Sequence, residues 1–593
     1  MSDLWLHPAS ALILGALLLP LIPARLKKVW LLAVPIAAFA LNTIMPPGVH
    51  GQWQFLDWTL TFGRVDRLAS VFGHIMSLIS IVATLYGLHV KEDAQHIAAW
   101  IYAGAALGAV YAGDFLTLFL FWEMMAFSSV FLVWFRRRKE SPAAGYRYLL
   151  VHMAGGVCLL AGIVLHASTP GSSFAFEAFE VSKMTPASWL VLIGFLVNGA
   201  VPPFHAWLPD AYGEGTFNGS IFLCTYTTKT AVYALCRGFA GLDLLVPLGV
   251  AMALYGVVYA VLENDSRRLL AYHIISQVGY MVAAVGLGTE MAINGACAHA
   301  FANILYKGLL FMGCGAVLHM TGQSKFTELG GLYQKMPWTF LLTLIGGLSI
   351  SAFPLTAGFV AKSMIVAAGF EAHNLWAAFL LMLASVGTFL HTGLKVPYFI
   401  FFGKNHCRPE TWERAAEPPW NMMTAMAISA FLCLFVGCYT PYLYDLLPHP
   451  VHYHPYTAYH LSETLQMLLF TAVSFFLFLK KLEPEPTISL DLDWPYRKGG
   501  RMFLWLAQKP VQFADNCLGE FYRVGGIAGL MGSARLAGWF DGRVIDGVVD
   551  GLAEAVRKLG QRLRPVQRGA VQENLTLAFA LGAALLIVLW LVW

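Results

Sequence analysis

The stretch INGACAHAFANILYKGLLFMGCGAVL, residues 293–318, decides the fold class. As a helix it is long enough to span about 30 Å of hydrocarbon, and its one charged residue is Lys307. His299, Asn303 and Lys307 recur at four-residue intervals, which places them on nearly one helical face. We therefore predict a membrane-spanning helix that carries a polar stripe, and such a stripe indicates a proton relay or a hydrated path.

The composition of the whole chain is that of a membrane protein. Of its 593 residues, 58% are hydrophobic and only 12% are charged, and the mean hydropathy is +0.63. Soluble domains carry about 25% charged residues, so a water-soluble chain of this length has no means of covering so much apolar surface. The net charge of +4 argues against nucleic acid as a partner. The start MSDLWLHPAS lacks the basic region of a signal peptide, and we expect the first apolar run to be retained.

Apolar runs recur along the chain, and we count about sixteen candidate spans. The run 338–370 is overlong and contains Pro354 and Gly358, which predicts a broken helix. The basic residues that follow alternate spans all fall on one side if every span crosses once. By the positive-inside rule that side is the cytoplasm, so the N-terminus is predicted to be external and residues 483–570 cytoplasmic. The predicted fold class is an all-α polytopic membrane protein.

Ionisable side chains lie inside several predicted spans. Glu123, Lys229 and Lys307 sit roughly nine or ten residues from the ends of their spans, at about 1.5 Å per residue, which is too deep for a side chain to reach water. Lys395 is shallower, so that snorkelling to the interface is an alternative there. Because desolvation disfavours the charged forms of lysine and glutamate, such groups can store and release protons. The alternative is a set of buried ion pairs that only hold helices together.

Several histidines also fall in or near apolar spans, namely His152, His273, His299 and His391. A lone histidine in an apolar core is more often structural than functional, but His299 shares a helical face with Lys307. His152 and His166 have the spacing of a bis-histidine haem helix, yet no second pair at that spacing lies within a span. We therefore predict no haem.

Other cofactor and metal patterns are also weak. The run HPVHYHPYTAYH (449–460) offers four histidines, and a solvated, proline-broken external loop explains it more simply than a metal site. The nine cysteines show no C-x-x-C spacing. The sequence contains no phosphate-binding glycine loop and no nucleophile elbow. We predict no metal, no cofactor and no catalytic residue of a chemical reaction, which leaves open whether the chain serves an enzyme complex.

Residues from about 483 to 570 mix charges of both signs with apolar residues. The charged residues fall away from one apolar helical face, which comprises Ile545, Val548, Val549, Leu552, Val556, Leu559 and Leu563. We predict an amphipathic helix on the cytoplasmic side and then one last span. Gly525, Gly526, Gly529 and Gly532 argue against an unbroken helix before it. A surface helix of a small soluble domain is the alternative.

Several motifs resemble those of a known protein family. PPFHAWLPDAY (202–212), which includes His205, resembles the P-x-H-x-W-L-P-D-A signature of the antiporter-like subunits shared by respiratory complex I, membrane-bound hydrogenases and Mrp-type sodium/proton antiporters. Further blocks are similar to that family over roughly residues 95–405: TTKTAVYALCRGF (227–239), NDSRRLLAYHIISQVGYM (264–281), HAFANILYKGLLF (299–311), ELGGLYQKMP (328–337) and FPLTAGFVAKS (353–363).

The resemblance implies a core of two inverted five-helix repeats, each with a broken helix. It implies N-terminal transmembrane helices (1–94), a first repeat (95–240), a second repeat (241–405), additional transmembrane helices (406–482), a lateral amphipathic segment (483–570) and a C-terminal transmembrane helix (571–593). It also implies a proton or ion path through Glu123, Asn198, His205, Lys229, His273, His299, Asn303, Lys307, His391 and Lys395.

Within that path the resemblance makes Glu123 the key glutamate, Lys229 and Lys307 relay lysines, and Lys395 the terminal lysine. Asn198 is a departure, because most members have a lysine there that pairs with the glutamate. A neutral amide cannot switch charge, so either Lys229 is the partner of Glu123 or the first half-channel works differently. The serine of the family's A-Y-S block is replaced by a histidine at 273, and Asn303 stands where several relatives carry a second relay histidine.

The resemblance points to more than one parent complex. The sequences FDGRVIDGVVDGL (540–552) and RPVQRGAVQEN (564–574) resemble the tail of the largest antiporter-like subunit of complex I, where a lateral helix straps neighbouring subunits. Lys395, eight residues before the glycine of F-F-G, resembles the D-type antiporter component of Mrp complexes. Our first hypothesis is a proton or Na+/H+ translocating, Mrp D-type component of a multi-subunit complex in a prokaryotic inner membrane. The alternatives are complex I or a membrane-bound hydrogenase, an inorganic-carbon uptake complex, and a structural scaffold with fixed ion pairs.

Overall fold

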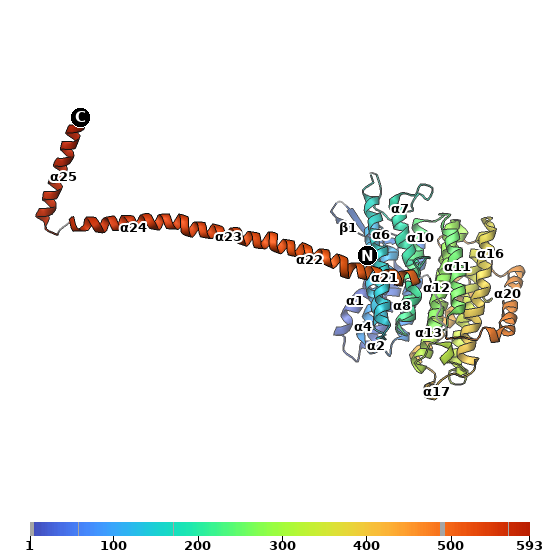
Figure 1. Ribbon diagram of the computed structural model, residues 1–593. Helices are drawn as coiled ribbons and strands as arrows, with labels where there is room; N and C mark the ends of the chain where they lie inside the picture. Colours follow the sequence, from blue (N-terminus) through green and yellow to red (C-terminus); the bar gives the residue numbers. More distant parts are fainter. Residues whose placement is uncertain (1–4, 57, 170, 487–490, 492, 567–568) are drawn as a thin grey trace. The chain divides into compact units, whose positions relative to one another are not determined.

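The computed structural model describes residues 5–56, 58–169, 171–486, 491, 493–566 and 569–593. The chain divides into two compact units, residues 1–492 and 493–593. The first unit is a bundle of helices (Figure 1).

Eleven helical segments among the described residues are long and apolar enough to cross a bilayer. They are α2 (Lys27–Ile44), α3 (Arg67–Tyr86), α5 (Phe115–Trp134), α6 (Ser141–Ala167), α11 (Leu245–Leu262), α12 (Ser266–Leu287), α13 (Glu290–Thr321), the segment Leu375–Phe402, α18 (Trp420–Cys438), α20 (Ala458–Leu477) and α25 (Val571–Val592). The chain is therefore a multi-pass membrane protein built from helices, as its composition predicts.

Shorter helices complete the bundle. They are α1 (Pro8–Leu18) with η1 (Leu19–Leu21), α4 (Asp93–Tyr111), α7 (Pro186–Asn198), α8 (Trp207–Gly213), α9 (Gly219–Thr225), α10 (Thr227–Gly238), α14 (Pro337–Ile350), α15 (Ala357–Glu371), α17 (Pro409–Arg414) and α19 (Pro441–Tyr444), with the 3-10 turns η2 (Phe326–Glu328), η3 (Leu332–Gln334) and η6 (Leu479–Lys481). The segment Leu375–Phe402 consists of α16 (Leu375–Thr388) and the π-helical turns η4 (Phe389–Lys395) and η5 (Tyr398–Phe402).

Three helices are interrupted inside the bundle. α7 ends at Asn198 and α8 begins at Trp207, α9 and α10 are separated at Tyr226, and α14 and α15 are separated by residues 351–356. The last break contains Pro354, as the overlong run 338–370 predicts. Interrupted helices leave backbone groups without their helical partners, which membrane proteins tolerate where the break is buried in protein or lines a wet cavity.

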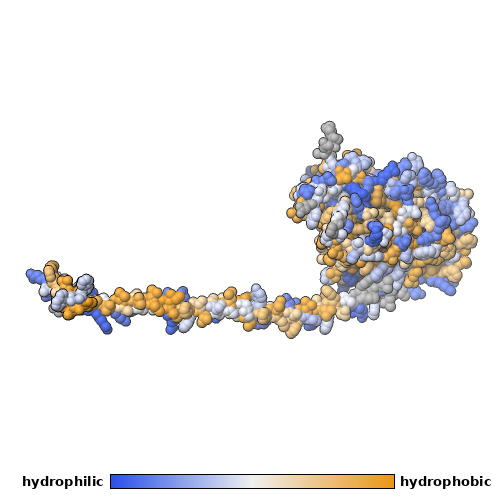
Figure 2. All heavy atoms as spheres, turned by 90° about the horizontal axis from the view of Figure 1, so that it is seen from above, coloured by the Kyte–Doolittle hydropathy of each residue, from blue (hydrophilic) through white to orange (hydrophobic). Residues whose placement is uncertain are grey.

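The centre of the first unit is formed by α12 and α13, which are buried along nearly their whole length. α13 packs against α3, α9, α12, α14, α15 and α18. Small residues bring α12 close to α11: a Cβ at Gly249 would overlap the backbone of Ala283, and a Cβ at Gly256 would lie 2.5 Å from Ser276 N. Figure 2 shows hydrophobic residues along the rim of the helical bundle, where lipid is expected.

A β-hairpin between α2 and α3 is absent from the sequence prediction. β1 (Gly48–Phe55) pairs antiparallel with β2 (Trp58–Val65), with Gly48 opposite Val65 and Phe55 opposite Trp58. The alternation of polar with aromatic and β-branched residues in this stretch was the available signal.

The second unit corrects the expectation that glycines break the helix before the amphipathic face. α21 (Asp493–Leu506), α22 (Gln512–Phe521), α23 (Gly529–Phe540) and α24 (Asp546–Leu563) follow one another through the π-helical turns η7 (Ala507–Val511), η8 (Tyr522–Ala528) and η9 (Asp541–Ile545), and the 3-10 turn η10 (Arg564–Val566) ends the run. Each glycine costs only about 1 kcal/mol relative to alanine, and η8 absorbs Gly525 and Gly526 without a gap. Figure 2 shows hydrophobic residues gathered along one side of this helix.

Candidate functional site

Glu123 projects from α5 towards α6. A Cβ at Gly156 of α6 would overlap Glu123 Oε1, so the missing side chain at Gly156 makes room for the carboxylate. Oε1 is buried, and among the described residues it has no hydrogen-bond partner. The site therefore holds a carboxyl group within a predicted span and without a cation in contact, an arrangement that needs a functional reason.

Asn198, the last residue of α7, contacts a histidine. The distance between Asn198 Oδ1 and His152 Nδ1 is 2.9 Å, and both side chains are buried. His152 also packs against Tyr148 of α6, with ring centroids 4.2 Å apart, and against Trp207 of α8, at 4.4 Å. Asn198 is thus half of an amide–imidazole pair beside the first helix break.

Lys229 lies on α10, just beyond the interruption at Tyr226, and is fully buried. Its Nζ donates a hydrogen bond of 2.7 Å to the backbone oxygen of Cys224. The structure shows no ion pair between Lys229 and Glu123, which the sequence offered as one of two possibilities. The ammonium group is therefore held by a peptide oxygen rather than by a carboxylate.

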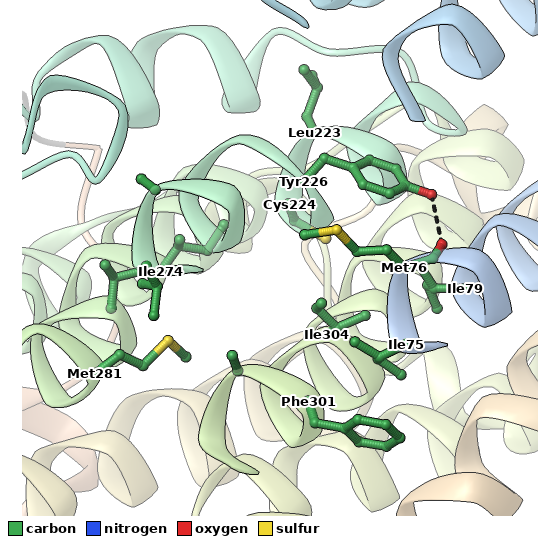
Figure 3. Close-up of a cluster of buried hydrophobic side chains, with 14 of the residues drawn as sticks. Ile75, Met76, Ile79, Leu223, Cys224, Tyr226, Ile274, Met281, Phe301 and Ile304 are labelled. Atoms are coloured by element: carbon green, nitrogen blue, oxygen red, sulfur yellow. Dashed lines mark hydrogen bonds between the residues drawn. The ribbon is translucent and has the colours of Figure 1, made fainter. Parts of the chain in front are cut away.

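Apolar side chains surround this bend in the chain (Figure 3). Figure 3 labels Ile75, Met76, Ile79, Leu223, Cys224, Tyr226, Ile274, Met281, Phe301 and Ile304. The Tyr226 hydroxyl donates to the backbone oxygen of Met76 at 3.1 Å, which ties the bend to α3. The bend before Lys229 is thus packed in the hydrophobic core of the bundle.

The polar stripe of α13 is completely buried, as its sequence predicts. Lys307 Nζ donates to the backbone oxygen of Leu270 at 2.8 Å, and Asn303 Nδ2 donates to the Tyr306 hydroxyl at 3.1 Å. Neither ring nitrogen of His299 has a hydrogen-bond partner in the part of the chain that the structure describes. A histidine with two unpaired nitrogens in a packed core is rare in static scaffolds.

Lys362 on α15 is a member of this site that the residue-by-residue prediction missed. It is 2% exposed, and its Nζ lies 4.7 Å from the centre of the Tyr280 ring. The Nζ has no hydrogen-bond partner among the described residues. Tyr280 also neighbours His299, with ring centroids 5.7 Å apart. The available signal was the lysine in FPLTAGFVAKS, eight residues after the proline of a predicted helix break.

His273 and His391 come together between α12 and η4. Their rings are 4.7 Å apart in an edge-to-face arrangement, and His273 Nε2 lies 3.2 Å from the Thr388 hydroxyl. One turn further along η4, Lys395 Nζ donates to the backbone oxygens of Val261 at 2.6 Å and Glu263 at 2.9 Å. Lys395 is only 5% exposed, so its ammonium rests on the carbonyl end of α11 instead of extending into solvent.

His205 lies in the break between α7 and α8 and meets an aspartate from far along the chain. His205 Nε2 is 2.7 Å from the Tyr255 hydroxyl and 3.4 Å from Asp491 Oδ1, while the Tyr272 hydroxyl donates to Asp491 Oδ2 at 2.6 Å. Tyr255 also donates to Asp491. Burial alone would raise the pKa of Asp491, but the hydrogen bonds from His205, Tyr255 and Tyr272 outweigh burial and hold this pKa at about 2. No sequence motif pointed to Asp491.

The buried lysines share one property that decides between two hypotheses. Within the described residues, none of Lys229, Lys307, Lys362 and Lys395 forms an ion pair with a carboxylate. A scaffold held by fixed ion pairs, one of the alternatives from sequence, therefore has no support at these positions. Among the described residues no group of three or more His, Cys, Asp or Glu side chains is arranged to hold a metal ion.

Residues 112–390 match the family described as NADH:quinone oxidoreductase/Mrp antiporter, transmembrane region. This core of the chain belongs to that family. The match includes most of the site described above, from Glu123 to Lys362, and ends before Lys395.

Two curated relatives extend the similarity. Hydrogenase-4 component B of Escherichia coli (strain K12) is 30% identical, with 68% of this chain and 65% of the relative covered. Na(+)/H(+) antiporter subunit A1 of Staphylococcus aureus (strain JH9) is 29% identical, with 75% of this chain and 62% of the relative covered. The chain thus spans less than two thirds of the length of either relative.

Two solved structures have the same fold. The Mrp complex from Dietzia sp. DQ12-45-1b matches with a TM-score of 0.67 and 21% identity, covering 78% of this chain and 98% of the matched chain. The membrane-bound sulfane sulfur reductase, an archaeal respiratory membrane complex, matches with a TM-score of 0.68 and 21% identity, covering 98% of this chain and 99% of the matched chain. In both structures the matched chain is part of a multi-subunit membrane complex.

Proposed function

We propose that this chain translocates protons across a prokaryotic plasma membrane as one subunit of a multi-subunit complex. The observation that carries the proposal is the set of buried ionisable side chains without carboxylate partners. Buried polar groups are almost always hydrogen-bonded to protein or to water. Groups such as His299 and Lys362, whose nitrogens have no hydrogen-bond partner among the described residues, favour a hydrated path between α12, α13 and α15.

The proposed path runs through both halves of the core. Glu123 receives protons in the first half, and Lys229 and Lys307 carry them towards the second. His299, Asn303 and Lys362 follow, and the His273–His391 pair leads to Lys395, from which protons leave. His205 and Asn198 lie beside the first helix break, where they influence proton transfer in the first half of the core. The chemistry needs only groups that change protonation state while buried, and it requires no cofactor in this chain.

We also propose the finer architecture. The eleven long segments, together with α1, α4 and the three interrupted pairs, make sixteen crossings. Two inverted repeats, 95–240 and 241–405, are supported by the recurrence of an interrupted helix, α7–α8 in the first and α14–α15 in the second. Sixteen crossings with an external N-terminus leave 483–570 on the cytoplasmic side, where its apolar face is proposed to lie along neighbouring subunits.

The parent complex is proposed to be an Mrp-type cation/proton antiporter, with this chain in the role of its D-type component. The similarity to an antiporter subunit supports the class. The likeness to the D-type component rests on Lys395. A membrane-bound hydrogenase is the second candidate, because hydrogenase-4 component B is a relative at 30% identity. There, redox chemistry on other subunits would drive the same proton movement. Complex I and an inorganic-carbon uptake complex are further candidates for the parent complex.

Purification of the native complex tests this proposal. An affinity tag on the chain, followed by identification of the co-purifying subunits, distinguishes an antiporter from a hydrogenase. The complex is then reconstituted into liposomes with a pH-sensitive dye. Proton movement driven by sodium supports the antiporter, and proton movement driven by an electron donor supports the oxidoreductase. A chain that purifies alone and moves no protons would contradict the proposal.

A further inference from the structure

The first half of the proposed path lacks a lysine beside Glu123, and the structure offers a different group. His152 lies on α6, four residues before Gly156, which is the residue that makes room for the Glu123 carboxylate. Residues four apart share a helical face and are separated by about 6 Å along the axis. His152 therefore projects from the turn of α6 next to the one against which the Glu123 carboxyl group of α5 lies.

The orientation of the His152 ring is fixed from three sides. Tyr148 and Trp207 pack on the ring, and Asn198 Oδ1 lies 2.9 Å from Nδ1. An amide oxygen only accepts hydrogen bonds, so Nδ1 carries the proton and Nε2 is left with its lone pair. His152 Nε2 is buried, and among the described residues it has no hydrogen-bond partner. The pair thus presents a neutral base in the turn next to Glu123.

The other candidate partner lies elsewhere. Lys229 Nζ donates to the backbone oxygen of Cys224 at 2.7 Å, and no ion pair joins it to Glu123. Glu123 Oε1 is buried and, like His152 Nε2, has no hydrogen-bond partner in the described part of the chain. The two unpaired polar atoms thus lie against neighbouring turns of α6 and have complementary chemistry, an acidic oxygen and a nitrogen lone pair.

We propose that His152, positioned by Asn198, is the proton acceptor for Glu123 in this chain. The O–H bond of the Glu123 carboxylic acid breaks and an N–H bond forms at His152 Nε2, either directly or through one water. The products are a carboxylate and an imidazolium, and the Nδ1 proton stays hydrogen-bonded to Asn198. The proton later leaves from Nε2 towards Lys229, which restores the neutral ring. Asn198 is a positioning residue. The inference rests on the proposed function.

The test measures proton movement by the purified complex in liposomes. His152→Gln removes the base but keeps a polar side chain, and we expect the rate to fall about a hundredfold. His166→Gln is the matched control, because it makes the same substitution at the outer end of the same helix. We expect that variant to match the wild type. An unchanged rate in His152→Gln would overturn the inference.

A second-site rescue tests whether His152 accepts protons or only packs against its neighbours. The double variant His152→Gln/Asn198→Lys supplies a titratable group from α7, and we expect it to recover at least about a tenth of the wild-type rate. A structural role for His152 predicts no rescue, so failure of the rescue in an assembled complex counts against the inference. If the complex with His152→Gln does not assemble, the variant Asn198→Asp tests the inference through the pH profile of transport. A carboxylate on Nδ1 favours the imidazolium, so the pH profile of transport shifts upward by about one unit or more, and an unshifted profile overturns the inference.

Lys307→Met distinguishes this inference from the proposed function. If Lys307→Met abolishes proton movement while His152→Gln leaves it intact, only the role of His152 is wrong. If both variants transport normally, the proposed function itself fails.

Discussion

The ammonium group of Lys362 lies 4.7 Å from the centre of the Tyr280 ring, and its Nζ has no hydrogen-bond partner among the residues that the structure describes. Among the described residues, the charge of this ammonium group is therefore stabilised through the aromatic face and not through a hydrogen bond. This contact joins α15, which follows the break between α14 and α15, to α12 at the centre of the bundle.

Replacing Lys362 by arginine tests whether this residue must release a proton or only contact the Tyr280 ring. Lys362→Arg keeps a cation over Tyr280, but guanidinium does not release its proton at usable pH. We expect transport to fall about tenfold or more while the complex assembles normally. Lys335→Arg is the control, because the exposed Lys335 lies over Trp412 at 5.8 Å, and it is expected to be silent. Wild-type flux from Lys362→Arg would remove this residue from the path.

Replacing Lys395 by arginine is also expected to slow transport, although Lys395 makes different contacts from Lys362. An arginine at this position can still donate to the backbone oxygens of Val261 and Glu263, so the fold should be retained. If protons leave the membrane from Lys395, Lys395→Arg blocks that release and slows transport about tenfold. Dye-monitored flux, with the exposed Lys404→Arg as control, measures the effect. Full activity in Lys395→Arg would show that the residue only anchors η4 to α11.

Glu123 and Lys229 are expected to contribute independently to the free energy of unfolding. Because no ion pair joins them, the effects of Glu123→Gln and Lys229→Met on the free energy of unfolding should add to within about 0.5 kcal/mol. Thermal unfolding of the purified complex for both single variants and the double variant supplies this cycle. A coupling energy well above about 1 kcal/mol would instead show that the two groups pair in the working protein. Each single variant is expected to lose transport, because each removes a group on the path.

The Asp491 carboxylate is expected to stay ionised over the working range of pH, so that it keeps accepting hydrogen bonds from Tyr255 and Tyr272. The folded-state pKa of Asp491, about 2, lies below its ordinary value of 3.8. A depressed carboxyl pKa stabilises the contact fully above the ordinary value, and that stabilisation is lost as the pH falls through about 2. Limited proteolysis between about pH 5 and 9 should therefore show no step that comes from protonation of Asp491.

Asp491→Ala tests the same contact by removal. We expect cleavage between residues 483 and 493 to become several-fold faster, because His205, Tyr255 and Tyr272 lose their common acceptor. Asp515→Ala, an exposed substitution on α22, is the control and should change nothing. If Asp491→Ala is cleaved at the wild-type rate, this contact does not anchor the segment.

The sequence predicted which of these side chains are buried better than it predicted their contacts. Lys307 and His299 were found because a charged residue in the middle of an apolar run has a strong signal and the four-residue spacing is local. Lys362 was missed because its depth depends on the helix break at Pro354. The His152–Asn198 pair joins residues 46 positions apart, and the Asp491–His205 contact spans 286. Neither separation follows from helical periodicity.

The amphipathic segment shows the opposite error. Local propensity predicted breaks at the glycines of 525–532, whereas the structure continues the helix through η8 and α23. A few residues of low propensity do not stop a long helix, since each costs only about 1 kcal/mol and the neighbouring turns remain favourable. The hairpin β1–β2 was missed because a search for apolar runs passes over short alternating segments.

The most direct test of proton translocation is the flux into liposomes that contain the purified complex with Lys307→Met. Lys307 is fully buried, and its Nζ donates only to the backbone oxygen of Leu270 among the described residues. Methionine keeps much of the side-chain volume but carries no proton. The proposed path predicts that flux falls at least about a hundredfold in a fully assembled complex, while the exposed control Lys183→Met keeps the wild-type rate. Undiminished flux in assembled Lys307→Met would contradict the proposal that protons cross the membrane through this chain.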